Sequence, residues 1–369
     1  MKKNVFGNEK NKIIRIKDIA LKAQVSTGTV DRVIHNRGRV AEEVKARVLK
    51  IIKDLNYEPN LMARMLGSKK QYHIAALFPD YGYDNFWLGP KSGIEKAEQN
   101  LKQYGVVVEQ FVFNPHDAKA FQDKAEELTH KRPDGILLSP IYYKETLPFF
   151  EKWNREKIPF VLFNTEISDY NPLSYIGQDS YQSGLLAAKL VHYGQPAPCS
   201  ILIAHIDEEI SNAQHLVKKE QGFRNYFIER KLEQQYNILR VELRKSGCND
   251  FMGKLDVIVQ SHPDLRHIFV TTSQAYHIAQ YLEEKNIMHI KLIGYDLVEP
   301  NLHYLNNGTI SFLINQNPEG QGYWGIKHLS DHLVFKKKVP VIRYLPLDVV
   351  TMENQNYFIA EKEPVFPDI

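Results

Sequence analysis

A short stretch near the start of the chain, VSTGTVDRVIHNRGRV, gathers small polar and cationic residues between Val25 and Val40. Hydroxyl groups donate and accept hydrogen bonds, and arginine binds a phosphate or a guanine edge through two N–H groups. The residues that could make such contacts are Ser26, Thr27, Gly28, Thr29, Arg32, His35, Arg37 and Arg39. If helices hold it rigid, this stretch has the chemistry to contact DNA; the alternative is a solvated basic surface.

A second set of polar and aromatic residues follows six apolar runs further along the chain. Its members are Asp80, Tyr83, Asn85, Phe86, Trp87, Ser139, Tyr142, Asn164, Glu166, Thr272, Ser273, Asp296 and Gln316. Hydrogen-bonding groups beside aromatic rings suit a sugar-like polyol. Any one of these residues could instead cap a loop, but their recurrence after six runs favours one common binding site.

Motifs for the common enzyme chemistries are absent from the sequence. It contains no GxxxxGK[ST], no GxGxxG after a strand, no GxSxG and no HExxH. The 14 histidines are scattered, and Cys199 and Cys248 lack CxxC spacing, so neither a metal site nor a cofactor is expected. The competing enzyme class is therefore not favoured, and we expect the chain not to be an enzyme.

Three amphipathic helices are predicted to position the first cluster. Their apolar faces are Ile16, Ile19, Ala20 and Ala23, then Val30, Val33 and Ile34, then Val44, Val48, Ile51, Ile52 and Leu55. Ser26 is a suitable N-cap for the second helix, and the short Gln24-Val25 connection forces a steep crossing, as in a helix-turn-helix. The second helix then presents Thr27, Gly28, Asp31 and Arg32 outward, where they can enter a major groove.

Alternating strands and helices are predicted to position the second set. The strand runs are 73–78, 105–113, 135–139, 158–163, 200–204, 267–272, 290–295 and 310–315. Repeated βα units indicate parallel sheets covered by helices, and about 300 residues are too many for one sheet of usual size. Two doubly wound lobes of the α/β class are therefore expected.

The charge of the 369-residue chain is unevenly distributed. Residues 1–70 carry 17 Lys and Arg against 7 Asp and Glu, a difference of +10, whereas the remainder carries 30 against 37, a difference of −7. Clustered positive charge is typical of a nucleic-acid-binding segment. The N-terminus lacks the apolar region of a signal peptide, and no run of 18 apolar residues is present. We expect a cytoplasmic, nucleoid-associated protein without membrane partners.

The segment 16–70, from IKDIALKAQVSTGTVDRVI to NLMARMLGSKK, resembles the LacI family of transcription regulators. It contains that family's "DIA…A.VS..TV.RV" signature and its "V…I..L.Y.PN..AR.L" continuation. The resemblance implies that Thr27, Gly28 and Arg32 read base edges, while His35, Arg37 and Arg39 contact the backbone. Thr27 and Gly28 are smaller than the side chains common at these positions, which limits hydrogen-bond readout.

The resemblance also implies a hinge helix beginning at Asn60. In the family, this helix folds when it pairs with the same helix of the dimer partner over the minor groove. Ala63 falls within the helix, and Leu66 matches the leucine that inserts between base pairs. The alternative is a linker that packs on the rest of the chain.

The later sequence resembles the type I periplasmic-binding-protein fold that these regulators carry. IGYD matches "IG(F/Y)D" and INQNPEGQG matches "I.Q.P...G", which implies effector-binding roles for Asp296 and Gln316, and for Asn85, Phe86, Ser139 and Asn164. Trp87 and Thr272 are added as ligand-binding candidates from their positions after strand runs. Two departures stand out: Lys219 replaces the arginine of "R..GF", and Thr272-Ser273 replaces "ND". Because lysine lacks the planar fork of arginine, ordinary hexose binding is less favoured and an acidic or phosphorylated sugar stays open.

These observations predict an all-α helix-turn-helix DNA-binding domain followed by two doubly wound parallel-sheet lobes. We expect the DNA-binding domain at 1–58, a hinge helix and linker at 59–71, and a ligand-binding domain at 72–369. One lobe is expected to cover about 72–177 with 317–340, and the other about 178–316 with 341–369.

The implied function is ligand-responsive, sequence-specific DNA binding that regulates transcription allosterically. The expected partners are double-stranded operator DNA, a sugar-like small-molecule effector and further copies of the chain, as a homodimer or a tetramer. The alternative is a soluble sugar-binding sensor or receptor without operator-specific DNA binding.

Overall fold

The computed structural model describes residues 14–34, 37–55, 70–167, 169–193, 198–207, 212–244 and 251–359. The chain divides into two compact units, Met1–Gly67 and Ser68–Ile369, which we call the head and the body and describe separately. Within the described ranges, no helix combines the length and apolar character that crossing a membrane requires.

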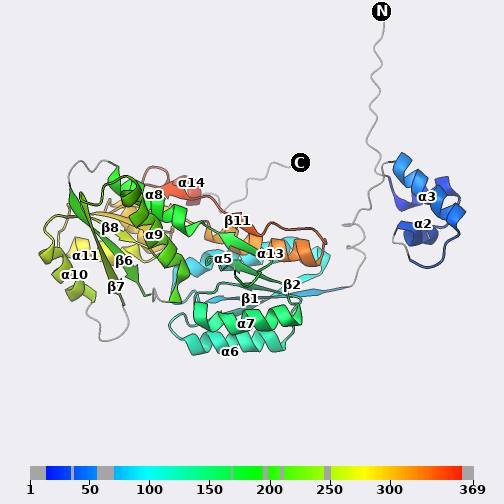
Figure 1. Ribbon diagram of the computed structural model, residues 1–369, viewed down its shortest axis with the longest axis horizontal. Helices are drawn as coiled ribbons and strands as arrows, with labels where there is room; N and C mark the ends of the chain where they lie inside the picture. Colours follow the sequence, from blue (N-terminus) through cyan, green and yellow to red (C-terminus); the bar gives the residue numbers. More distant parts are fainter. Residues whose placement is uncertain are drawn as a thin grey trace, which may run out of the picture. The chain divides into compact units, whose positions relative to one another are not determined.

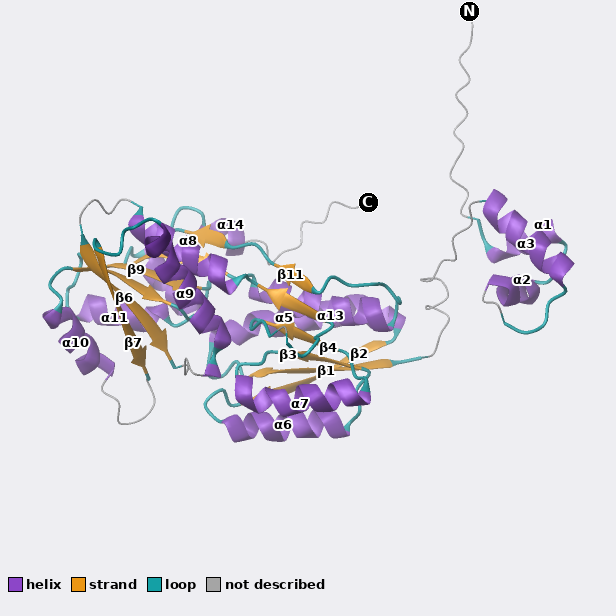
Figure 2. Ribbon diagram, viewed as in Figure 1, coloured by secondary structure: helices purple, strands orange, loops and turns teal. Residues whose placement is uncertain are grey.

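Three helices form the head: α1 (Ile16–Ala23), α2 (Thr27–Ile34) and α3 (Glu42–Asp54) (Figures 1 and 2). Gln24 ends α1 in the left-handed conformation, with φ of 52°, and so turns the chain sharply into α2. The Ser26 hydroxyl accepts the Thr29 backbone N–H at 3.1 Å, which confirms the predicted N-cap. The shared core contains Ile19, Ala20, Ala23, Val30, Val33 and Val48, all from the predicted apolar faces.

The first sheet of the body has the order β11-β5-β4-β3-β1-β2, and all its strands are parallel. The strands are β1 (Tyr72–Pro79), β2 (Val106–Phe113), β3 (Gly135–Leu138), β4 (Phe160–Phe163), β5 (Ser174–Gly177) and β11 (Ile342–Tyr344). α6 (Ala118–His130) and α7 (Tyr143–Glu156) cover one face, while α5 (Leu88–Leu101) and α13 (Pro318–Leu333) lie on the other (Figure 2).

The second sheet has the order β12-β10-β9-β8-β6-β7, in which only β12 is antiparallel. The strands are β6 (Cys199–Ile206), β7 (Tyr236–Leu243), β8 (Leu265–Val270), β9 (Lys291–Tyr295), β10 (Ile310–Asn315) and β12 (Asp348–Val350). α8 (Ser180–His192) and α9 (Gln214–Glu229) cover one face; α10 (Phe251–Ser261), α11 (Ala275–Glu284) and α12 (Glu299–Asn306) cover the other. The short helix α14 (Gln355–Ile359) follows β12.

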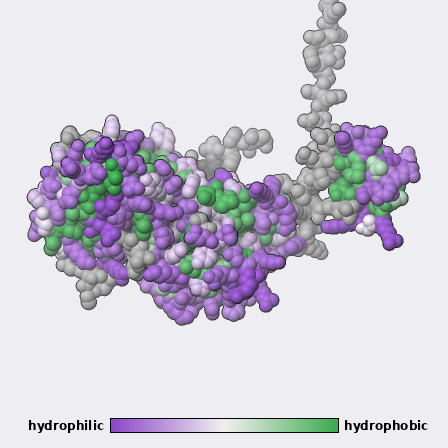
Figure 3. All heavy atoms as spheres, viewed as in Figure 1, coloured by the Kyte–Doolittle hydropathy of each residue, from purple (hydrophilic) through white to green (hydrophobic). Residues whose placement is uncertain are grey.

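The two sheets therefore form two α/β lobes, as the sequence predicts, each with an apolar core beneath its helices. On the face drawn in Figure 3, hydrophilic residues predominate over the body, as expected when the apolar side chains are buried in these cores.

The boundary expected near residue 340 differs from the structure. Residues after 340 do not all join the second lobe, because β11 pairs in parallel with β5 of the first sheet, with Ile342 opposite Tyr175. Only β12, a few residues later, joins the second sheet. The chain thus crosses between the lobes three times: after β5, after β10, and between β11 and β12.

Candidate functional site

The first turns of α2 form an exposed surface of the head. Thr27, Gly28 and Arg32 are exposed, while Thr29 is half-buried and its hydroxyl lies 2.9 Å from that of Ser26. A methyl group added at Gly28 would meet only the Ser26 hydroxyl, at 3.8 Å, so another molecule can approach α2 closely there. Gly28 and Arg32, four residues apart, therefore share an accessible face of α2, and Thr27 is exposed at the start of the helix.

A hollow lies beside this surface, and Arg32, Arg39 and Lys45 are among its lining residues. It adjoins the N-terminus of α3, where backbone N–H groups without helical partners favour an anion. The basic side chains suit a phosphate of a nucleic-acid backbone, whereas Glu42, which also lines the hollow, opposes one. The other predicted DNA contacts, His35, Asn60, Ala63 and Leu66, lie outside the described residues.

Most predicted residues of the body lie at the carboxyl ends of strands. Ser139, Asn164, Thr272, Asp296 and Gln316 each come within two residues of a strand end, and each is buried. Because the strands concerned run parallel within each sheet, their ends share one edge of that sheet. Their positions directly after apolar runs in the sequence therefore correspond to the carboxyl ends of strands in the structure.

The aromatic segment after β1 forms the short 3-10 helix η1 (Asn85–Trp87). The Phe86 and Trp87 rings are buried and nearly perpendicular, with centroids 4.9 Å apart, and Trp87 lies 6.2 Å from the ring of Phe163 at the end of β4. Asn85 is exposed, so the structure does not gather it with the buried polar residues.

A chain of polar contacts joins the two lobes at Asp296. Gln316 Nε2 donates to Asp296 Oδ2 at 2.5 Å, and Gln178 Nε2, which follows β5 of the first lobe, donates to Gln316 Oε1. Since a carboxylate only accepts, Asp296 requires the NH2 group of Gln316 to face it, and this leaves Gln316 Oε1 to accept from Gln178. The carboxylate thus sets the orientation of both amides.

Asp296 is in an electrostatically unfavourable position for a charged group. Its side chain is 1% exposed, and its backbone has a left-handed φ of 67°, which an aspartate tolerates better than most residues. Burial raises the pKa of Asp296 to about 7, a shift that the Asp84 carboxylate reinforces and that Lys219 and the hydrogen bond from Gln316 oppose. The surroundings of Asp296 therefore compensate its charge only in part, as is common for carboxylates in binding sites.

Four buried polar atoms at these strand ends have no hydrogen-bond partner among the residues that the structure describes. They are Ser139 Oγ, Gln178 Oε1, Thr272 Oγ1 and Asp296 Oδ1. Buried polar atoms are nearly always hydrogen-bonded, so hydrogen-bonding capacity is open at these strand ends of the two lobes. Two are pure acceptors and two are hydroxyls, so a ligand rich in hydroxyl groups is complementary to them.

Lys219 on α9 is buried and engaged with the protein itself. Its Nζ donates to the Thr271 carbonyl at 2.8 Å and lies 3.7 Å from the centroid of the Tyr295 ring. The position of α9 depends on close packing against α8: a Cβ added at Gly222 would lie 2.0 Å from the carbonyl oxygen of Tyr181, so only glycine fits there. This explains the glycine of the KEQGF segment, one turn after Lys219.

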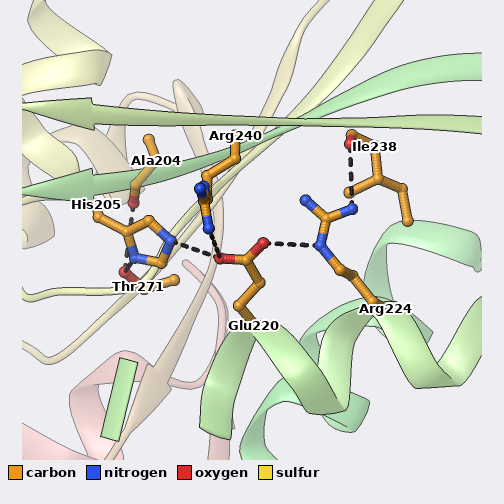
Figure 4. A network of polar contacts seen from close by, with 7 residues as sticks. All are labelled: Ala204, His205, Glu220, Arg224, Ile238, Arg240 and Thr271. Atoms are coloured by element: carbon orange, nitrogen blue, oxygen red, sulfur yellow. Dashed lines mark hydrogen bonds and ion pairs between the residues drawn. The ribbon is translucent and has the colours of Figure 1, made fainter. Parts of the chain in front are cut away.

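Glu220, the neighbour of Lys219, is the centre of a separate network (Figure 4). Its carboxylate lies 3.1 Å from His205 Nε2, 2.7 Å from Arg224 Nε and 3.9 Å from Arg240 Nη1. His205 Nδ1 in turn lies 2.8 Å from the Thr271 hydroxyl. Burial alone would raise the pKa of Glu220, but the hydrogen bonds from His205 and Arg224 outweigh it and lower that pKa to about 2.

Further contacts bridge the lobes beside this site. The Ser273 hydroxyl donates to Asp84 Oδ2 at 2.6 Å, and Asp84 Oδ1 also accepts the Phe86 backbone N–H at 2.9 Å. Lys218 Nζ donates to Glu166 Oε2 at 3.0 Å. The lobes therefore touch through groups at their strand ends, so a ligand bound there would contact both.

Four residues of these contacts were not among the site residues predicted from the sequence: Gln178, Asp84, His205 and Glu220. Gln178 follows β5, a four-residue strand that the apolar pattern did not reveal, although it precedes a clear helix N-cap at Asp179. Asp84 directly precedes the selected Asn85, and as an N-cap of η1 it could have been found from capping preferences. Among the described residues, no group of three or more His, Cys, Asp or Glu side chains could hold a metal ion.

Comparison with known proteins agrees with both parts of this description. Residues 15–60 match the family "Bacterial regulatory proteins, lacI family", and residues 74–337 match the family "Periplasmic binding protein domain". A crystal structure from Bacteroides fragilis, assigned to the LacI transcriptional regulators, is 32% identical with a TM-score of 0.74 and covers 78% of this chain and 99% of its own.

Named relatives are similar over shorter ranges. The HTH-type transcriptional regulator MalR of Streptococcus pneumoniae is 31% identical over 179 residues, which is 48% of this chain and 52% of the relative. The ribose operon repressor of Haemophilus influenzae is 35% identical over 123 residues, which is 33% of this chain and 36% of the relative. The chain thus spans about half the length, or less, of these curated relatives. With its lacI-type head and its periplasmic-binding-protein body, the chain belongs to the LacI family of bacterial regulatory proteins.

Proposed function

We propose that the protein is an effector-responsive, sequence-specific DNA-binding regulator of transcription. The observation that carries this proposal is the set of four unpartnered polar atoms at the strand ends of the body, in a chain whose head exposes Thr27, Gly28 and Arg32 on α2. The regulators MalR and the ribose operon repressor are similar to this chain, which supports a regulatory rather than an enzymatic role.

The effector is proposed to be a sugar or a sugar derivative. Hydroxyl groups of such a molecule can donate to Asp296 Oδ1 and Gln178 Oε1 and can exchange hydrogen bonds with Ser139 and Thr272. The buried Phe86 and Trp87 offer apolar ring surface for the C–H face of a pyranose or furanose.

Regulation follows from the position of the effector site. The effector contacts both lobes, so it changes the free-energy difference between lobe arrangements by its differential affinity for them. If one arrangement favours DNA binding, the effector and the operator alter each other's affinity by the same factor. The sign, induction or co-repression, is set by which arrangement the operator favours.

The proposed partners are double-stranded operator DNA and a second copy of the chain, in the cytoplasm. Two copies related by a twofold axis place two heads on half-sites of a near-palindromic operator. The cationic head predicts that binding depends steeply on salt, since each neutralised phosphate releases counterions.

A fluorescence-anisotropy titration tests the proposal, with DNA from upstream of the protein's own gene against scrambled DNA at several salt concentrations. We expect tight, salt-dependent binding to the upstream DNA that a sugar from a broad panel shifts. Equal affinity for both DNAs, together with sugar binding by the body, would instead favour a sugar sensor without operator-specific DNA binding.

Arg32→Ala should relax base preference by about 1–3 kcal/mol if this arginine contacts guanine through two hydrogen bonds.

A further inference from the structure

The ammonium group of Lys219 is the only buried cation that the described site residues bring near Asp296, and it is already engaged with protein groups. It donates to the Thr271 carbonyl at 2.8 Å, contacts the face of the Tyr295 ring and interacts electrostatically with Asp296. A carboxylate or phosphate on an effector would have to displace these partners before it could bind the ammonium.

The other charges near the site oppose an anion. Asp84 and Asp296 both face this region, and Asp84 raises the pKa of Asp296 by repulsion. Two of the four unpartnered atoms, Asp296 Oδ1 and Gln178 Oε1, only accept hydrogen bonds. An anionic group would add repulsion there and supply no donors, whereas a hydroxyl group supplies the donor that each atom lacks.

The Glu220 network holds Thr271 behind this arrangement. His205 is fully buried on β6, and its ring bridges the Glu220 carboxylate and the Thr271 hydroxyl (Figure 4). Thr271 thus has its hydroxyl fixed by His205 and its carbonyl bound by Lys219. The next residue, Thr272, carries one of the unpartnered hydroxyls.

We infer that Glu220 is a positioning residue of the effector site. Through His205 and Thr271, it keeps the Lys219 ammonium in contact with groups of the protein itself. The site therefore selects hydroxyl-rich effectors that carry no anionic group. This inference rests on the proposed sensor function. It also excludes an acidic or phosphorylated sugar as the effector, the alternative that Lys219 leaves open when the sequence is considered alone.

Isothermal titration of the full chain with matched ligands tests the inference. Three series, built on glucose, galactose and ribose, each contain the neutral sugar, its sugar acid and its terminal phosphate. For the series that binds, we expect the neutral sugar to bind about 100-fold more tightly than its acid or phosphate, because charged groups left without donors cost more than lost neutral hydrogen bonds. The same ligands are added to the operator-binding assay.

Variants separate positioning from stability. Glu220→Gln replaces one carboxylate oxygen with a donor that faces His205 or Arg224, and we expect the ratio of neutral to anionic affinity to fall about tenfold. Lys219→Arg keeps the charge and adds donors, so it should lower the same ratio. The matched control is Asp256→Asn, which removes another ion pair of the same lobe, with Lys285 at 2.9 Å, and should leave the ratio unchanged.

The outcomes distinguish the two proposals. A wild-type preference for the acid or the phosphate, with that ligand shifting operator binding, overturns the inference and leaves the sensor function intact. An unchanged ratio in both Glu220→Gln and Lys219→Arg also overturns the inference, as does an equal change in Asp256→Asn. If no ligand binds and none shifts operator binding, the proposed sensor function fails and the inference fails with it.

Discussion

Asp296 and Glu220 are two buried carboxylates of the same lobe with opposite electrostatic environments. Asp296 Oδ1 has no hydrogen-bond partner among the described residues, and burial raises the pKa of Asp296 to about 7. Both oxygens of Glu220 accept hydrogen bonds, from His205 and Arg224, and its pKa is lowered to about 2. The structure thus provides hydrogen-bond partners for both oxygens of Glu220 but for only one oxygen of Asp296 among the described residues.

This difference separates binding from support. A carboxylate that the fold satisfies stabilises the fold, and its loss leaves buried donors without acceptors. A carboxylate that the fold leaves incomplete destabilises the free protein and regains that free energy when a ligand donates to it. Comparing the two residues by mutation therefore tests which one binds the effector directly and which one supports the site from behind.

Asp296→Asn is expected to have the largest effect on effector affinity. Loss of the charged acceptor should weaken binding about 100-fold, because a hydrogen bond to a charged group is replaced by a weaker neutral one. Affinity for operator DNA without effector should stay near that of the wild type. Titration calorimetry measures the first quantity and anisotropy the second; wild-type effector affinity in the variant would remove Asp296 from the site.

Glu220→Gln should mainly affect stability, in contrast to Asp296→Asn. We expect the free energy of unfolding to fall by about 2 kcal/mol at pH 7, because His205, Arg224 and Arg240 lose the carboxylate that compensates them. Chemical denaturation of both variants under the same conditions provides the comparison. A larger loss of stability in Asp296→Asn than in Glu220→Gln would reverse the assignment of roles.

The two residues should also differ in their pH dependence. The pKa of Asp296 is raised from 3.8, so its contribution to stability is full below that value and is lost as the pH rises through about 7. The pKa of Glu220 is lowered from 4.5, so its contribution is full above that value and is lost as the pH falls through about 2.

Between pH 5 and pH 8, the stability of the wild type relative to Asp296→Asn should therefore decline, and this decline should exceed any change relative to Glu220→Gln, since Glu220 is already ionised over that range. Denaturation curves at one-unit intervals of pH check both trends. A difference between the wild type and Asp296→Asn that does not vary with pH would mean that Asp296 is ionised throughout and already has its partner.

Gln178→Ala should give the smallest effect, a several-fold loss of effector affinity. The side chain offers one neutral acceptor, Oε1, and its removal also leaves Gln316 Oε1 without a donor. Gln280→Ala, which removes an exposed amide of α11 that bonds Glu284, is the control for a generic loss of glutamine. Equal affinities in the two variants would show that the first lobe contributes no acceptor at this position.

Much of the fold was predictable because its signals are local. The eight predicted strand runs each coincide with a strand, and the three helices of the head have the predicted apolar faces. The four strands that the sequence pattern did not reveal carry weaker signals. β5, β11 and β12 have only three or four residues each, and β7 at the sheet edge alternates exposed and half-buried positions.

The site was predictable only in part. The position of a residue at the end of a strand can be inferred from its neighbours in the sequence, whereas the identity of its hydrogen-bond partners cannot. Asp296 and Gln316 could be selected from their places after apolar runs, yet nothing in the sequence shows that Gln178 lies against Gln316 from 138 positions away. Lys219 could be selected as a departure from a motif, but its bond to the Thr271 carbonyl depends on how α9 packs. Long-range contacts of this kind require the fold.

Operator binding by the wild type and Asp296→Asn at increasing effector concentration tests the account most directly. We expect the effector to shift the affinity of the wild type for the operator, and we expect Asp296→Asn to bind the same DNA but to need about 100-fold more effector for the same shift. Two results would contradict the claim that this carboxylate links a small molecule to DNA binding. One is a response of Asp296→Asn at the effector concentration that suffices for the wild type. The other is an operator affinity of the wild type that does not change with any ligand that binds the body.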